Sequence, residues 1–404
     1  MNKHRTRTTG WDRLLSGVLC LALVLGLLPA AGLIQPAEAA ETEHWAYPYA
    51  EQLIEWGVMS ELRLDDEINR AEFVAMCNRA FGYKQLGGVT FIDVPSSAWY
   101  AQDMDIGYTA GYFKGTSTDP AYLKASPNDP LTREQAAVMV ARNLRLQETV
   151  GESLGFTDSR ELQEWSSGLI GAAVAEGMIG GYTDGSFRPA NNITRGEVAK
   201  MLVSVIGTPI DTEGSYTLGN VYGNVTISSS KVTLRNTVIL GNLYITGGVD
   251  LGNVLLENVT VLGRIVISGG GESDAAKSSV ILRNVEADEL MVDSMVDQFV
   301  TISAYGFTDI PVTSVRSDTW LEDASEAGYG LQYIEFDAAP GAKLQLAGAI
   351  KEVLNKTPLS SLQLVKGTAQ EITIDEYAKG STVLVADGTL VYKMNLDVAT
   401  TVTG

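Results

Sequence analysis

The stretch Ile193-Thr194-Arg195-Gly196-Glu197 decides how the first half of this chain folds. Thr194 followed three residues later by Glu197 is the capping-box pattern, which begins a helix. Five apolar residues then recur at helical spacing: Val198, Met201, Leu202, Val205 and Ile206. Gly207 ends the pattern. Arg195 therefore occupies the first helical position, beside amides without intrahelical partners and at the positive end of the helix dipole. This position predicts a site for an anion.

The same pattern occurs twice earlier in the chain, at Asn69-Arg70-Ala71-Glu72 and Thr132-Arg133-Glu134-Gln135. The three arginines recur at a nearly constant spacing. When they are aligned, one core position of each helix carries a methionine: Met76, Met139 and Met201. A fixed period with matching core positions indicates an internal repeat. Each unit contains a first helix, a loop and a capped second helix, and we expect the three capped helices to pack together.

We place the three units at residues 41–83, 89–147 and 154–207. The third unit opens with Phe156-Thr157-Asp158, contains Trp165 and ends with the capped helix. The second opens with Phe91-Ile92-Asp93-Val94 and contains Trp99. The first has Trp45 but lacks the aromatic-x-Asp opening and the glycine-rich loop, so it is a degenerate copy.

These units resemble S-layer homology domains, modules that hold exported proteins on bacterial cell walls. The resemblance covers roughly residues 41–207 and is strongest in the third unit. It implies a pseudo-three-fold helical domain whose grooves bind a secondary cell-wall polysaccharide, commonly one with pyruvylated sugars. A pyruvate ketal presents a carboxylate, which is the species that the capped arginines are expected to bind.

The resemblance also implies which residues contact the polysaccharide. The implied ligand-binding residues are the arginines, aspartates and tryptophans at matching positions: Arg195, Arg133, Asp158, Asp93, Trp165, Trp99, Arg70 and Trp45. Structural roles remain open for each type of residue. The tryptophans would also suit a core, the aspartates would also suit caps of helices, and the arginines would also suit surface salt bridges.

The three grooves are expected to be unequal. In the first unit the loop from Ser60 to Glu67 carries four acids: Glu61, Asp65, Asp66 and Glu67. We expect these carboxylates to lie beside Arg70, to repel an acidic ligand and to occupy the arginine themselves. Arg195 and Arg133 are then the arginines expected to dominate binding.

The N-terminus has the features of a secretory signal peptide, assigned to residues 1–39. Four basic residues precede an apolar run from Leu14 to about Leu28, and Ala37-Glu38-Ala39 supplies a cleavage site. The alternative, a membrane anchor from Leu14 to Ile34, is disfavoured by Pro29 within that stretch and by the cleavage site. After processing we expect no integral membrane segment. With a net charge of −20 the chain repels nucleic acid, so we expect no nucleic-acid partner.

After residue 207 the composition changes to short alternating strands and turns. Leu234-Arg235-Asn236, Leu256-Glu257-Asn258 and Leu282-Arg283-Asn284 recur, with an insertion from Glu272 to Lys277 before the third copy. This period predicts coils of a right-handed parallel β-helix, with asparagines stacked at one corner. We assign 208–216 as a linker, 217–306 as the β-helix and 307–404 as a β-rich continuation or cap. Within that last region, residues 348–355 are expected to form a short capping helix.

Little in the sequence points to catalysis. His4 and Cys20 leave with the predicted signal peptide, so His44 and Cys77 are the only histidine and cysteine expected in the processed chain, and we predict no cofactor, no metal site and no disulfide. Cys77 is expected to be a core residue. We therefore expect a non-enzymatic, secreted protein at the cell wall or S-layer, with a β-helical display domain that contacts an unknown surface partner. A wall-anchored polysaccharide-degrading enzyme and an adhesin are the alternatives.

Overall fold

The computed structural model describes residues 44–404, except 118, 120–121, 150–153, 271–278 and 295–298. The described residues belong to one compact unit. The predicted signal peptide, 1–39, and the predicted insertion, 272–277, lie outside the described residues.

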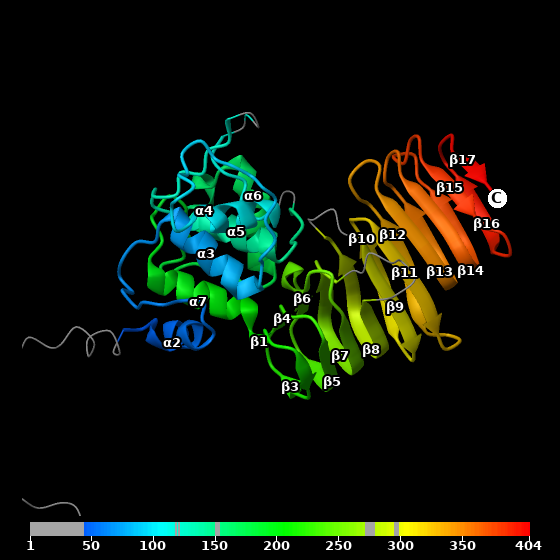
Figure 1. The fold of residues 1–404 in the computed structure, drawn as a ribbon, viewed down its shortest axis with the longest axis horizontal. Helices are drawn as coiled ribbons and strands as arrows, with labels where there is room; N and C mark the ends of the chain where they lie inside the picture. The colour runs from blue at the N-terminus through cyan, green and yellow to red at the C-terminus, as the bar shows by residue number, and fades with distance from the viewer. Residues whose placement is uncertain (1–43, 118, 120–121, 150–153, 271–278, 295–298) are drawn as a thin grey trace, which may run out of the picture. The chain divides into compact units, whose positions relative to one another are not determined.

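Three pairs of helices make up the first part of the described chain (Figure 1). The first helix of each pair is uncapped by a side chain, whereas the second begins at one of the three arginines. The six helices are α2 Tyr47–Glu55, α3 Arg70–Phe81, α4 Ala101–Thr109, α5 Arg133–Asn143, α6 Glu164–Ala175 and α7 Arg195–Ile206. A short 3-10 helix, η2 Ser159–Glu161, precedes α6.

The predicted capping boxes are confirmed in all three second helices. In α3, α5 and α7 the N-cap side chain accepts a hydrogen bond from the backbone of the third helical residue. The side chain of that third residue, Glu72, Gln135 or Glu197, in turn accepts from the N-cap backbone. Each box satisfies two amides that lack intrahelical partners, which is why each helix begins at the residue after the cap. That residue is an arginine in all three helices.

The three units close into a ring. Isolated antiparallel bridges join the segments just before the capped helices in cyclic order: Glu67 with Thr194, Asn69 with Pro130, and Thr132 with Asn192. The helices follow the same order, because α4 packs on α3, α6 on α5 and α2 on α7. The first helix of each unit thus packs on the capped helix of the preceding unit, and the first unit closes on the third.

One hydrophobic core runs through this ring. The aligned methionines Met76, Met139 and Met201 are all buried in it, as predicted. Cys77 is also fully buried in this core, which confirms its assignment as a core residue. Burial raises the pKa of its thiol well above the usual value.

The strands form a parallel β-solenoid. Those described by the structure join one 17-stranded sheet in which every recorded strand pairing is parallel. Figure 1 shows successive coils stacked side by side. The strands are β1 Thr208–Ile210, β2 Gly214–Tyr216, β3 Gly219–Val221, β4 Val225–Ile227, β5 Val232–Ile239, β6 Leu243–Ile245, β7 Val254–Ile267, β8 Val280–Val292, β9 Val300–Gly306, β10 Asp309–Val315, β11 Thr319–Ser325, β12 Gly330–Phe336, β13 Lys343–Asn355, β14 Ser361–Ile374, β15 Thr382–Val385, β16 Leu390–Leu396 and β17 Thr401–Thr403. The β-helical prediction is confirmed as a solenoid, and its handedness stays a prediction.

The predicted asparagine corner is present. Asn236, Asn258 and Asn284 all have left-handed backbones, with φ of 48°, 54° and 53°. Their side chains form a ladder in which Asn258 Nδ2 donates to Asn236 Oδ1 at 3.1 Å and Asn284 Nδ2 donates to Asn258 Oδ1 at 2.8 Å. Asparagine tolerates this backbone conformation and supplies both a donor and an acceptor, so it suits a repeated corner.

Two predictions about the second half are wrong. Residues 208–216, assigned as a linker, form β1 and β2, which pair with β4 and β5 as the first coil. Residues 348–355, assigned as a capping helix, belong to strand β13. Ile350 and Val353 are three apart, which mimics a helical stripe, but both point inward and pair with Ala369 and Ile372 of the next coil.

The region after residue 307 is a continuation of the solenoid through β17. Of the two predicted possibilities, continuation or cap, the structure supports continuation.

Side chains of the first coils cap helices of the ring. Asn224 Nδ2 donates to the carbonyl of Val205 at 3.1 Å, and Thr226 Oγ1 donates to that of Ile206 at 2.8 Å. Thr246 Oγ1 donates to the carbonyl of Phe81 at 2.7 Å. These carbonyls at the ends of α7 and α3 have no intrahelical partner, so the solenoid satisfies them.

Candidate functional site

Three cavities surround the ring, and each is built by all three units. We name them after their arginines: the Arg70 groove, the Arg133 groove and the Arg195 groove. Each contains the arginine that begins one capped helix. A second unit contributes a loop and one face of its own capped helix, and the remaining unit contributes a tryptophan. The cyclic packing of the helices explains this mixed origin, because the loop that faces an arginine belongs to another unit.

The three tryptophans open onto these grooves. Trp165 lines the Arg70 groove, Trp45 the Arg133 groove and Trp99 the Arg195 groove. Their side chains are 49%, 54% and 61% exposed, respectively. Exposed indoles at three matching positions are unlike core residues, so the alternative of core packing is wrong for them.

The Arg70 groove is the largest, with a volume of about 810 Å³. Arg70 is buried: its Nε donates to the carbonyl of Ala125 at 2.9 Å, and its guanidinium lies 5.2 Å from the ring centre of Phe113. One further nitrogen, Nη1, donates to the side-chain oxygen of Gln135 at 3.3 Å. Burial lowers the pKa of Arg70, and the more distant Asp129 and Asp93 raise it in part.

The Arg133 groove has a volume of about 690 Å³. Arg133 Nη2 donates to the carbonyl of Gly180 at 2.7 Å, and Nη1 lies 3.8 Å from a carboxylate oxygen of Glu197. The guanidinium also stacks near Tyr182 and Phe187, 4.8 and 5.1 Å from their ring centres. The Tyr182 hydroxyl donates to the same Glu197 carboxylate.

The Arg195 groove is the smallest, at about 250 Å³. Arg195 Nη2 donates to the carbonyl of Glu61 at 2.8 Å and its Nε donates to that of Leu62 at 3.2 Å. Its Nη1 lies 3.7 Å from Glu72. Arg63 crosses the same region and pairs with Glu61 at 2.8 Å.

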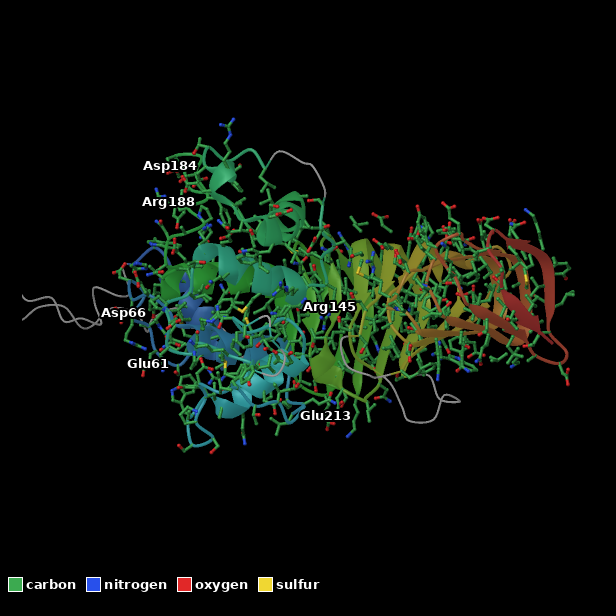
Figure 2. The ribbon with its side chains drawn as sticks, turned by 90° about the horizontal axis from the view of Figure 1, so that it is seen from above. Glu61, Asp66, Arg145, Asp184, Arg188 and Glu213 are labelled. Carbon is green, nitrogen blue, oxygen red and sulfur yellow. The ribbon has the colours of Figure 1, made fainter. Side chains whose placement is uncertain are left out.

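These contacts correct one prediction. The acidic loop of the first unit lies against Arg195, not against Arg70. A repeat in the sequence aligns each arginine with the loop that precedes it, whereas the ring places that loop beside the arginine of another unit. Glu61 and Asp66 of this loop, labelled in Figure 2, both pair with Arg63. Arg195, which we expected to be available to an acidic ligand, is therefore the arginine that has carboxylates around it.

The predicted aspartates hold the loops in place. Asp93 accepts hydrogen bonds from the amides of Ala125 and Ser126 at 2.8 and 2.7 Å. Asp158 accepts from the amides of Phe187 and Arg188 at 2.8 and 2.7 Å. Partial burial raises the pKa of Asp158, but these hydrogen bonds outweigh it and the pKa is lowered.

Both aspartates are thus committed to backbone amides. These hydrogen bonds fix the turns that shape two grooves and are not helix caps, while contact of either aspartate with a sugar stays a prediction.

The loop of the third unit carries its own ion pair. Arg188 Nη2 lies 2.8 Å from Asp184, and its guanidinium stacks 3.9 Å from the ring centre of Tyr182 (Figure 2). The two charges cancel at the rim of the Arg133 groove, so they add little to its attraction for an anion.

Two basic residues in the Arg70 groove escaped sequence reasoning. Lys114 comes from the loop after α4, and Arg142 from the last turn of α5. A signal for Arg142 was available, since Arg79 occupies the matching position of α3 and lines the Arg195 groove. Among the residues that the structure describes, no cluster of three or more metal-ligating side chains is found. No described helix has the length and apolarity to cross a membrane.

Comparison with known proteins finds a family model that matches one segment of the chain. Residues 155–199 match the model of the S-layer homology domain family, so the third unit is such a domain, as the sequence predicted. The Surface-layer 125 kDa protein of Lysinibacillus sphaericus is 32% identical over 114 residues, which are 28% of this chain and 9% of that protein. The Cellulosome-anchoring protein of Acetivibrio thermocellus is 30% identical over 112 residues, 26% of this chain and 22% of that protein.

An enzyme is also among the relatives. The Amylopullulanase of Thermoanaerobacterium thermosulfurigenes is 29% identical over 145 residues, 34% of this chain but 8% of that protein. The chain thus spans only a small part of the curated relatives that it matches. The S-layer homology domain and the surface-protein relatives identify a cell-wall-associated surface protein, which confirms the predicted location.

Proposed function

We propose that all three units are S-layer homology repeats and that their grooves anchor the protein by binding an acidic, pyruvylated cell-wall polysaccharide. The observation that carries this proposal is the threefold recurrence of one arrangement, in which a helix-capping arginine and an exposed tryptophan line the same groove. The family model matches the third unit, and the equivalent geometry extends the assignment to the other two.

The chemistry of the grooves suits a sugar that carries a carboxylate. A guanidinium offers paired donors that match a carboxylate, and the helix N-terminus beneath it adds a favourable dipole. An exposed indole offers a flat apolar face to one side of a sugar ring. The net charge of −20 repels polyanions at long range, so capture of an acidic polymer requires such local positive sites.

For the solenoid we propose a display role without catalysis. Acids lie opposite one another on adjacent strands at Glu352 of β13 with Glu371 of β14 and at Glu286 of β8 with Asp309 of β10, and such pairs are candidates for a glycosidase pair. Hydrogen bonds from Lys393 and Asn395 lower the pKa of Glu371, which keeps it ionised. A general acid needs the opposite shift, so Glu371 is unsuited to that role.

The test uses the full secreted chain and isolated cell walls in a sedimentation assay. We expect saturable binding that weakens when salt is raised and that is lost when mild acid removes the ketals from the walls. Binding that is equal before and after removal of the ketals would contradict the proposed role of the carboxylate. Release of reducing sugars from the walls would contradict the proposal that the solenoid is not catalytic.

A further inference from the structure

The charges that line the three grooves are strongly unequal. The Arg70 groove is lined by Arg70, Lys114 and Arg142, and no acid is among its lining residues in the described chain. Each of the other two grooves mixes basic residues with two carboxylates. The Arg133 groove carries Arg133, Lys200, Asp65 and Glu197, and the Arg195 groove carries Arg63, Arg79, Arg195, Glu61 and Glu72.

The third residue of each capped helix sets much of this difference. It faces the arginine of a neighbouring unit in every groove. In two grooves it is a glutamate that lies 3.8 Å from Arg133 or 3.7 Å from Arg195. In the Arg70 groove it is Gln135, whose neutral oxygen accepts a hydrogen bond without cancelling the charge of Arg70. Asp129 and Asp93 act on Arg70 only from farther away, so among the described residues no carboxylate at ion-pair distance competes with a ligand for its charge.

A second positive site lies in the same groove. Partial burial and the charge of Arg142 both lower the pKa of Lys114, while Glu148 raises it. Burial also lowers the pKa of Arg142, against the influence of Glu148. Within the described part of the chain, neither cation is within ion-pair distance of Glu148 or of any other carboxylate. Two cations that repel one another in this way are stabilised by an anion bound between them.

We propose that the Arg70 groove binds a stretch of the cell-wall glycan that carries two acidic groups, one at Arg70 and one between Lys114 and Arg142. This inference rests on the proposed function and specifies its principal site. A volume of about 810 Å³ lies within the usual range of small-molecule sites, whereas the 250 Å³ of the Arg195 groove lies below it. Trp165 lines the same groove and offers the sugar an apolar face.

The test compares two synthetic probes by calorimetry with the full secreted chain. The first is a methyl glycoside with one pyruvate ketal, and the second is the corresponding disaccharide with a ketal on each sugar. The decisive variants are Lys114→Gln, in an exposed loop, and Arg142→Gln. Arg79→Gln is the matched comparison, because Arg79 holds the same helical position in the Arg195 groove. Lys379→Gln, at an exposed position of the solenoid outside the three grooves, is the control.

We expect the disaccharide to bind at least tenfold more tightly than the single sugar. Lys114→Gln and Arg142→Gln should each weaken the disaccharide by about ten- to a hundredfold, the range for loss of one charge-assisted hydrogen bond, with little effect on the single sugar. Arg79→Gln should weaken the disaccharide much less than either decisive variant, and Lys379→Gln should leave both probes unchanged. Circular dichroism checks that each variant is folded, and Lys114→Gln decides the matter if Arg142→Gln unfolds.

Equal affinity for the two probes, with no effect of either decisive variant, would overturn the two-charge site and leave the wall-binding proposal standing. Failure of the wild-type chain to bind either probe or whole cell walls would overturn both. Loss of disaccharide binding in Arg79→Gln but not in Lys114→Gln would place the principal site in the Arg195 groove and refute the assignment.

Discussion

Changing Gln135 to glutamate should convert the Arg70 groove to the charge pattern of the other two. The side-chain oxygen at this position already accepts a hydrogen bond from Arg70 Nη1 at 3.3 Å. A carboxylate there would pair with the guanidinium, as Glu197 pairs with Arg133 and Glu72 with Arg195. The substitution should preserve the helix, because glutamate occupies this position of the capping box in α3 and α7.

The size of the effect follows from electrostatics. Two carboxylates that share one guanidinium lie roughly 6 Å apart, and at an effective dielectric constant near 20 their repulsion is about 2.8 kcal/mol. Physiological salt screens this to about 1.4 kcal/mol. Gln135→Glu should therefore weaken the acidic glycan by about tenfold, and by more at low salt.

Calorimetry of wild type and Gln135→Glu with the purified polysaccharide, at two salt concentrations, measures this effect. Thermal unfolding supplies the control, since a glutamate near the helix N-terminus should leave the midpoint equal or slightly higher. The mirror variant, Glu197→Gln, removes the carboxylate partner of Arg133 and should strengthen binding in that groove. If Gln135→Glu binds as tightly as wild type at low salt, Arg70 does not bind the acid.

The remaining predictions concern the framework. Gly348→Ala should destabilise the solenoid far more than Gly328→Ala, because a Cβ at Gly348 would lie 1.9 Å from a backbone oxygen, whereas one at Gly328 meets nothing within 4 Å. The two glycines have similar φ, so the difference between the two variants in thermal unfolding measures this clash alone. Asn258→Ala should lower the free energy of unfolding by about 2–3 kcal/mol, since it removes two ladder hydrogen bonds and leaves alanine in a left-handed backbone. The lowered pKa of Asp158 means that its contribution to stability is present above about pH 4 and lost as the pH falls through the lowered value, so the deficit of Asp158→Asn should shrink in acid unfolding curves. Cys77 should resist thiol reagents until the chain unfolds, because burial raises its pKa and blocks access.

The elements of the ring could be predicted because their signals are local. A cap, an N3 acid or amide and an apolar stripe lie within a dozen residues, so Thr194 and Glu197 suffice to start α7. The coils of the solenoid could be predicted for the same reason, since each Asn corner has the same left-handed backbone conformation. The prediction of a short helix at 348–355 was wrong because inward residues spaced three apart, such as Ile350 and Val353, are found both in helices and around a bend in a coil.

The arginines and tryptophans that line the grooves could be predicted from the sequence, but the loop that faces each arginine could not. Arg70, Arg133 and Arg195 all line grooves, as do the three tryptophans. Which loop faces which arginine depends on how three similar units close, and a repeat carries no information about that order. The acids of the first loop were therefore assigned to Arg70, while the ring places them against Arg195.

The order of the units in the ring shows that the third residue of each capped helix has two roles. Glutamate and glutamine at the third helical position serve a capping box equally well, so local folding does not distinguish Gln135 from Glu72 or Glu197. The ring places this residue within reach of the arginine of a neighbouring unit, where the choice decides whether that arginine is neutralised. The same side chain thus starts its own helix and sets the charge of a groove that belongs to another. The neutral residue lies in the largest of the three grooves together with two further cations, and this combination is the reason for proposing that the Arg70 groove binds the acidic polymer.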